Sequence, residues 1–117
     1  MSTLANIVVA LVALIHVYIL VLEMFLWDKP AGLRAFGQTQ AAATASRVLA
    51  ANQGLYNGFL AAGLFWGLSL GQAGHDVKVF FLLCVLVAGL YGAATASRKI
   101  LFVQAIPAAM GLVLLFI

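Results

Sequence analysis

Four long apolar runs, separated by short polar connections, fill almost the whole chain. The first contains VVALVALIHVYILVLEMFLW, and a helix of ~20 such residues is long enough to cross the hydrocarbon core of a bilayer. Hydrophobic residues make up 66% of the 117 residues and charged residues only 8%. A soluble domain of this length could not bury that much apolar surface. The pattern therefore predicts an all-α integral membrane protein with one transmembrane domain over residues 1–117.

The polar connections set the expected bounds of the spans. The predicted spans are residues 4–27, 47–70, 77–97 and 100–117. Charge and a helix breaker coincide at Asp28-Lys29-Pro30, which ends the first span. Such short connections make consecutive helices antiparallel neighbours, so we expect a four-helix transmembrane bundle. Within the longest connection, residues 28–46, Leu33 and Phe36 could lay a short segment on the membrane surface, or the connection could be an ordinary polar loop.

The basic residues are distributed unequally between the two sides of such a bundle. One side carries Lys29, Arg34, Arg47, Arg98 and Lys99, and the other carries Lys78. Basic connections stay in the cytoplasm, so both chain termini are expected on the outer side. The basic residues are few and lie at the ends of apolar runs, which does not favour a nucleic-acid partner.

Small residues recur at four-residue spacing in the second and third runs. Examples are Gly54-xxx-Gly58 and Ala88-xxx-Gly92. This spacing lets helices approach closely in lipid, where water does not drive helix association. The motifs could join helices within one chain or join subunits in a homo-oligomer. Cys84 is the only cysteine, so no intrachain disulfide can form.

Glu23 is the most informative residue for function. An ionisable side chain near the centre of an apolar span costs roughly 2.5–3.5 kcal/mol on insertion scales. His16 lies seven residues earlier, on nearly the same helix face but about 10 Å away along the axis, which is too far for a direct hydrogen bond. The two side chains are the predicted catalytic pair. Glu23 could instead pair with Arg34, Arg47 or Arg98, and His16 could be a neutral hydrogen-bonding group between helices.

Polar residues from every predicted span fall at similar depths. Counting about 1.5 Å per helical residue from the cytoplasmic boundary places most of them in one layer roughly 5–10 Å deep, with others nearer the midplane. The predicted ligand-binding residues are Asn52, Gln53, Tyr56, Asn57, Tyr91, Thr95 and Gln104. Pro107 could kink the last span beside Gln104 and free the carbonyl of Val103. Each amide is also typical of plain hydrogen bonding between helices.

Several familiar kinds of site are missing from the sequence. It contains no phosphate-binding loop, dinucleotide fingerprint, HExxH motif or cysteine-based metal motif. Amides are poor substitutes for strong metal ligands, so we expect no metal at His16 and Glu23. We expect no cofactor, haem and flavin included.

Four segments of the chain carry a family resemblance. They are HVYILVLEMFLW at 16–27, Phe36-Gly37 in the first connection, ANQGLYNGFLAAGL at 51–64 and GLYGAATASRKILFVQAIPAAMGL at 89–112. Together they resemble an uncharacterised family of small bacterial four-helix membrane proteins, a domain-of-unknown-function family. The resemblance covers nearly the whole chain. It implies a four-helix integral membrane protein and brings no assigned activity. The expected location of the chain is the bacterial inner membrane, as a multi-pass protein.

The polar residues leave three functional hypotheses. The first is that a polar pocket in the cytoplasmic leaflet binds a small lipophilic molecule, with acid–base isomerase or hydratase chemistry at Glu23 and His16. The second is proton-coupled transport of a small molecule through Glu23. The third is a structural or accessory subunit without a ligand. Whether the chain is an enzyme stays open at this stage, and the lipid bilayer is its expected surrounding.

Overall fold

The computed structural model describes residues 2–117, and these residues form helices and turns without a strand. The helical elements are α1 (Ser2–Phe25), α2 (Pro30–Phe36), α3 (Gln40–Ser69), η1 (Gly71–Gly74), α4 (His75–Thr95), η2 (Leu101–Ala105) and α5 (Ile106–Leu115). The predicted all-α class is confirmed.

The four-helix prediction is met only in part. A fifth α-helix, α2, occupies the first connection, and α3 begins at Gln40 rather than at residue 47. Two helical segments, Ser2–Phe25 and Gly71–Thr95, are long and apolar enough to cross a membrane, whereas the apolar segment Leu101–Leu115 is shorter. The remaining long helix, α3, carries polar amides in its middle. The number of membrane spans is therefore not confirmed.

Proline and glycine set the boundaries around α2. Pro30 occupies the first turn of α2, and Lys29 before it is extended (φ −103°, ψ 165°), as a residue preceding proline prefers. Gly37 ends α2 in the left-handed conformation (φ 59°), where its N–H donates to the carbonyl of Leu33. The Thr39 hydroxyl then accepts from the N–H of Ala42 at 3.1 Å and caps the start of α3. These contacts set both ends of α2 and the start of α3.

The described chain divides into two compact units. The terminal unit comprises the residues up to Ile15 together with Leu60–Ile117, and the central unit comprises His16–Phe59. Helices α1 and α3 each contribute one half to either unit.

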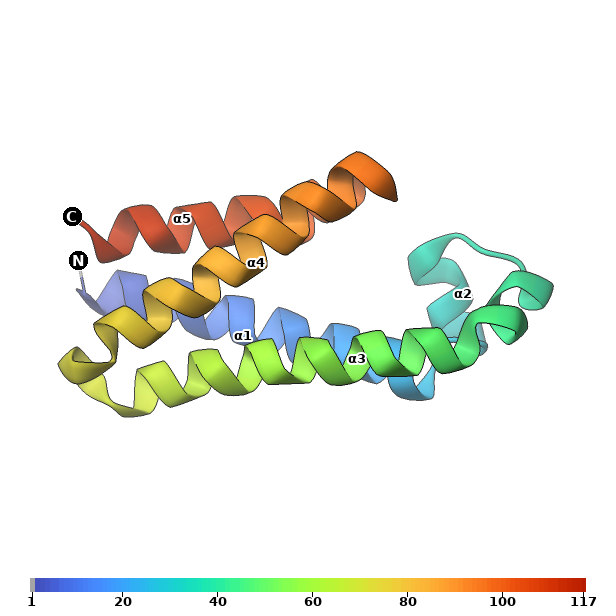
Figure 1. Cartoon of the computed structure of the whole chain (residues 1–117), viewed down its shortest axis with the longest axis horizontal. Coiled ribbons are helices and arrows are strands. Elements are labelled where there is room, and N and C mark those ends of the chain that lie inside the picture. The colour runs from blue at the N-terminus through green and yellow to red at the C-terminus, as the bar shows by residue number, and fades with distance from the viewer. Residues whose placement is uncertain (1) are drawn as a thin grey trace. The chain divides into compact units, whose positions relative to one another are not determined.

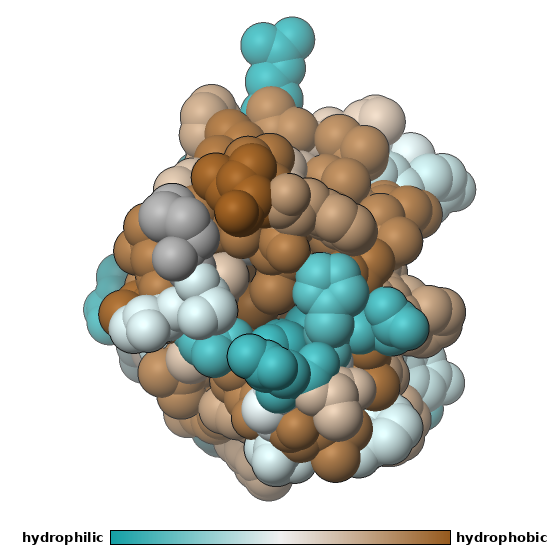
Figure 2. Space-filling model, turned by 90° about the vertical axis from the view of Figure 1, so that its left-hand side faces the viewer, coloured by the Kyte–Doolittle hydropathy of each residue, from teal (hydrophilic) through white to brown (hydrophobic). Residues whose placement is uncertain are grey.

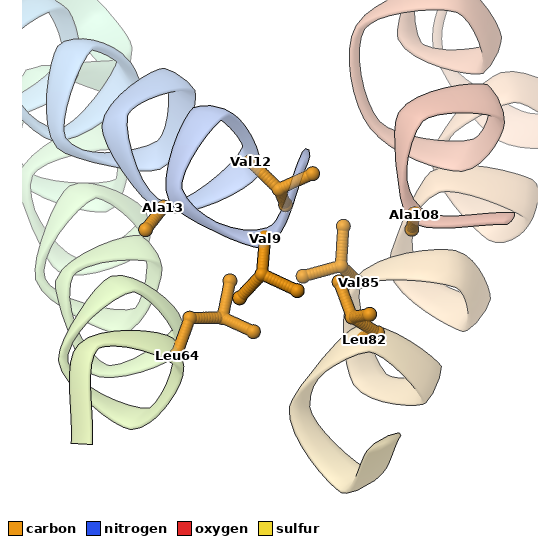
Figure 3. Packing of buried hydrophobic residues seen from close by; sticks show 7 residues of the cluster. All are labelled: Val9, Val12, Ala13, Leu64, Leu82, Val85 and Ala108. Atoms are coloured by element: carbon orange, nitrogen blue, oxygen red, sulfur yellow. The ribbon is translucent and has the colours of Figure 1, made fainter. Parts of the chain in front are cut away.

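The terminal unit holds an apolar core from four helices. Its fully or almost fully buried members are Val9, Val12, Ala13, Leu64, Leu82, Val85 and Ala108. Figure 3 shows Val9 of α1 pointing toward Leu64 of α3 and toward Leu82 and Val85 of α4. Helices α4 and α5 form a hairpin and lie side by side (Figure 1). The backbones of this hairpin approach closely at Gly89, where an added Cβ would lie only 2.6 Å from the backbone nitrogen of Ala105.

Both apolar helical segments leave most of their surface uncovered. In the most apolar part of α1, 33% of the residues are buried, and in that of the α4 segment, 22%. The exposed side of α1 carries large apolar side chains, among them Ile7, Leu11 and Leu14, each more than half exposed. A core helix of a soluble protein would instead bury such residues.

Candidate functional site

The central unit places Glu23 against α3. Glu23 lies near the end of α1, and its side chain is only 7% exposed. The Asn57 amide of α3 donates to Glu23 Oε1 at 2.6 Å. A carboxylate can accept several hydrogen bonds, and a short one from an amide fixes its orientation. Asn57, one of the predicted ligand-binding residues, thus contacts Glu23.

Two glycines allow this close contact. A Cβ at Gly54 would lie 2.6 Å from Met24 Cγ and 3.1 Å from Glu23 Cβ. A Cβ at Gly58, one turn later, would lie 2.6 Å from Leu20 Cδ1. The Gly54-xxx-Gly58 motif therefore packs against α1 of the same chain, which is one of the two uses that its spacing predicts.

His16 is fully buried, with an exposure of 0%. It lies two helical turns before Glu23 on α1, so about 10 Å of helix axis separates the two residues. A direct proton transfer between them does not fit this spacing, and any link requires an intermediate group.

The other predicted residues of α3 face outward. The Asn52 amide donates to the carbonyl of Val48 on its own helix at 2.9 Å, and Asn52 is exposed. Gln53 is exposed as well, and Tyr56 is 58% exposed. Asn57 lies five positions after Asn52, so the two side chains point in directions about 140° apart around the helix axis. Depth alone does not distinguish these faces.

The three predicted residues beyond α3 belong to the terminal unit. Tyr91 is 73% exposed, and the Thr95 hydroxyl donates to the Tyr91 carbonyl at 2.7 Å on the same helix. Gln104 is half-buried within η2. A layer shared by all predicted spans stays a prediction.

An irregular turn stands where Pro107 predicts a kink. The N–H of Ile106 donates to the carbonyl of Leu101, five residues back, so η2 is a π-helical turn. Pro107 follows in the first turn of α5, where its missing N–H is tolerated. Single π turns inside helices are often found at functional positions, which makes the surroundings of Gln104 of interest.

A groove of about 410 Å³ lies in the central unit between α1 and α3. Its apolar lining residues include Met24, Phe25 and Val48, and its polar lining residues are Asp28, Lys29, Arg47 and Asn52. Glu23 is not among its lining residues, although it neighbours Met24 in sequence. The groove therefore adjoins the buried pair and does not contain it.

Two polar contacts join the residues just after α1 to α3. Arg47 Nη1 lies 3.6 Å from Asp28 Oδ2, and both residues line the groove. Trp27 Nε1 donates to the Ser46 hydroxyl at 3.0 Å. Because Arg47 pairs with Asp28, the partner that the structure gives Glu23 is a neutral amide.

Sequence reasoning missed a second buried polar pair, Lys78 and Asn6. Lys78 is 5% exposed, and its Nζ donates to Asn6 Oδ1 at 3.0 Å in the terminal unit. The signal was present, because Lys78 lies one turn inside an apolar helix. The distribution of basic residues alone makes Lys78 only a charge that sets topology. Among residues 2–117, no group of three His, Cys, Asp or Glu side chains could hold a metal ion.

These features define a small all-helical protein with two apolar membrane-length helices and a buried acid–amide pair. The chain belongs to the family described as "Protein of unknown function (DUF1304)", whose model matches residues 10–116. It is also similar to a bacterial protein described as "Uncharacterized protein YpaA", from Lactococcus lactis subsp. lactis (strain IL1403). The two are 31% identical over 106 residues, covering 89% of each chain. No solved structure matches the chain.

Proposed function

We propose that the chain is a multi-pass membrane protein that binds a small, largely apolar molecule beside the Glu23–Asn57 pair. Two features support insertion into a membrane. The segments Ser2–Phe25 and Gly71–Thr95 have sufficient length and apolarity, and each leaves most of its residues uncovered. A signal sequence is a poor explanation for the second of them, which lies far from the N-terminus.

The buried acid–amide contact carries the proposal. Charged groups within apolar helices are usually paired with an opposite charge when their role is structural. Glu23 is instead held by Asn57 at 2.6 Å, while the neighbouring Arg47 pairs with Asp28. An oriented carboxyl without a cationic partner can exchange a proton or take a ligand donor.

The adjoining groove supplies a place for the apolar part of such a molecule. Its volume of about 410 Å³ is within the range of small-molecule sites. Met24 and Phe25 offer apolar contact, and Asn52 offers a polar group. The molecule would reach Glu23 by displacing the flexible Met24 side chain, since methionine adapts readily to new shapes.

Acid–base isomerisation or hydration at Glu23 would need water or an amide to connect it with His16, because of their spacing along α1. Proton-coupled transport would use the same carboxyl and would not need His16. Five other predicted residues would contact the ligand only if their side chains turn toward it. They are Gln53, Tyr56, Tyr91, Thr95 and Gln104.

The membrane topology is part of this proposal. The basic residues favour the bacterial inner membrane with the first connection in the cytoplasm and both termini outside. A homo-oligomer could use Ala88, which is exposed, whereas Gly54, Gly58 and Gly92 already contact other residues of the chain.

The test compares the molecules that copurify with wild-type protein and with Glu23→Gln. Glutamine keeps the shape and still accepts from Asn57, but it cannot lose or carry the carboxyl proton. We expect wild-type protein to release a small apolar compound in near-stoichiometric amount, and Glu23→Gln to lose most of it while unfolding at nearly the same temperature. Mass spectrometry of solvent extracts measures the compound.

Asp76→Asn is the matched control, because it removes one exposed carboxylate in the terminal unit. It should keep the compound at the wild-type level. Equal amounts in the wild-type protein and Glu23→Gln, or no compound in either, would argue against a ligand site at Glu23.

A further inference from the structure

A second pocket, in the terminal unit, lies beside the buried lysine. It has a volume of about 350 Å³ and is lined by residues of α1, η1, α4 and α5. Its polar residues include Asn6, Gln72, His75 and Lys78, and its apolar residues include Leu114 and Leu115. Figure 2 faces this end of the unit and shows hydrophilic side chains gathered within a largely hydrophobic surround.

Lys78 has no ion-pair partner among residues 2–117. Only 5% of its surface is exposed, and its Nζ donates to the neutral Asn6 amide oxygen at 3.0 Å. An ammonium group has three donors and is strongly stabilised by an anionic acceptor when it is removed from water. The nearby acidic residue, Asp76, is exposed and is not among the pocket residues. Lys78 therefore has donors available on the pocket side.

The position of the pocket indicates which class of anion would bind there. It lies where α1 and α4, the two helices of membrane length, both begin. His75 and Lys78 both lie in the first turn of α4. The N-terminal end of a helix carries the positive end of its dipole, which also favours an anion there. An occupant at such an end would place anionic oxygens on Lys78 and apolar atoms against Leu114 and Leu115. A volume of about 350 Å³ suits a headgroup rather than a whole lipid.

We propose that this pocket binds the anionic phosphate headgroup of a membrane lipid, with Lys78 as the principal donor. Asn6 holds the ammonium group in place, and His75 and Gln72 provide further polar contacts. The site is separate from the Glu23 site and does not depend on the function proposed for it.

The test measures binding of phosphatidylglycerol, phosphatidylcholine and inorganic phosphate to delipidated protein in neutral detergent. Native mass spectrometry gives the affinities, and unfolding temperatures give an independent reading. We expect wild-type protein to bind phosphatidylglycerol at least about tenfold more tightly than phosphatidylcholine, as one charge-assisted contact would produce. Inorganic phosphate should bind much more weakly, because it lacks the apolar part. If phosphate binds as tightly as phosphatidylglycerol, the anion site stands and its source is free phosphate.

Asn6→Asp is the decisive variant. It keeps the shape of the side chain and places a carboxylate beside Lys78, so the ammonium group gains an internal counter-ion. The variant should unfold at the same or a higher temperature without lipid, and it should lose the preference for phosphatidylglycerol. Lys78→Met, which removes the charge and keeps the aliphatic stem, should lose it as well.

Lys99→Met is the control for net charge. It changes the charge by the same unit as Asn6→Asp, at an exposed residue between α4 and η2. It should keep the wild-type preference of about tenfold or more. The proposal is overturned if wild-type protein binds both lipids equally. It is also overturned if Asn6→Asp keeps the preference, even where Lys78→Met fails to fold.

Discussion

Asn57→Leu is expected to lower the free energy of unfolding by about 3 kcal/mol, because it leaves the Glu23 carboxyl buried without its donor. Removing one partner of a buried polar pair costs the desolvation of the other, ~1–3 kcal/mol for a neutral group and more for a charged one. Leucine has as many side-chain heavy atoms as asparagine and is not smaller, so the substitution does not create a cavity. Reversible unfolding in mixed detergent micelles, followed by circular dichroism, measures the change.

The matched control is Asn52→Leu. Its amide bonds only to the Val48 carbonyl of its own helix and is exposed, so this variant should change the free energy of unfolding by less than about 0.5 kcal/mol. Equal losses at the two positions would contradict the assigned Glu23–Asn57 contact.

The double variant Glu23→Leu/Asn57→Leu separates a functional pair from a structural one. Replacing both members of a buried hydrogen bond by apolar groups is often nearly neutral for stability. We expect the double variant to recover to within about 1 kcal/mol of wild-type protein, with a large coupling energy between the two positions. If the double variant stays as unstable as Asn57→Leu, the pair would be structural, as the accessory-subunit hypothesis requires.

Leu82→Ala is expected to have the second large effect, a loss of about 2–4 kcal/mol. Leu82 is fully buried in the terminal core, where its Cδ1 would lie only 3.0 Å from a side chain at Gly111. The hairpin backbone cannot close the resulting cavity without shifting α4 against α5. In a bilayer, most of the loss comes from the cavity, because lipid also solvates the leucine of the unfolded state.

Leu83→Ala, at the next position of α4, provides the comparison. Leu83 is 45% exposed and should tolerate truncation with a loss of less than about 1 kcal/mol. Both variants are read by the same unfolding measurement as Asn57→Leu. Similar losses at the two positions would contradict the core of Figure 3, which includes Leu82 and does not include Leu83.

Much of the helical pattern could be predicted from local chemistry. Pro30 keeps Lys29 extended and begins α2, and the predicted break at Asp28-Lys29-Pro30 agrees with a helix that ends at Phe25. The distortion near Pro107 follows from its missing N–H, although the sequence did not predict that it takes the form of a π turn. Helix α2 was only one of two options, because seven residues give too little periodicity to decide.

The site could be predicted only in part, because depth along a helix does not fix its rotation. Glu23 and Asn57 were both predicted, and the structure joins them. Asn52 and Tyr56 lie at similar depths but face away. Small rotations decide such faces, and they depend on close packing at residues such as Gly54.

Lys78 was missed for a different reason. A basic residue near the end of an apolar run usually lies at the interface, where it sets orientation. Its burial depends on Asn6, which is 72 residues away in the sequence. Pairing between such distant residues is a tertiary property that a single sequence does not reveal.

The most direct test of the Glu23 site is an experimental structure of the wild-type protein crystallised from a lipid mesophase. We predict that Glu23 faces α3, that Asn57 lies within hydrogen-bonding distance of it, and that non-protein density occupies the groove beside Met24. A Glu23 side chain that faces lipid or bulk water, or a groove filled only by the protein's own side chains, would contradict the proposed function.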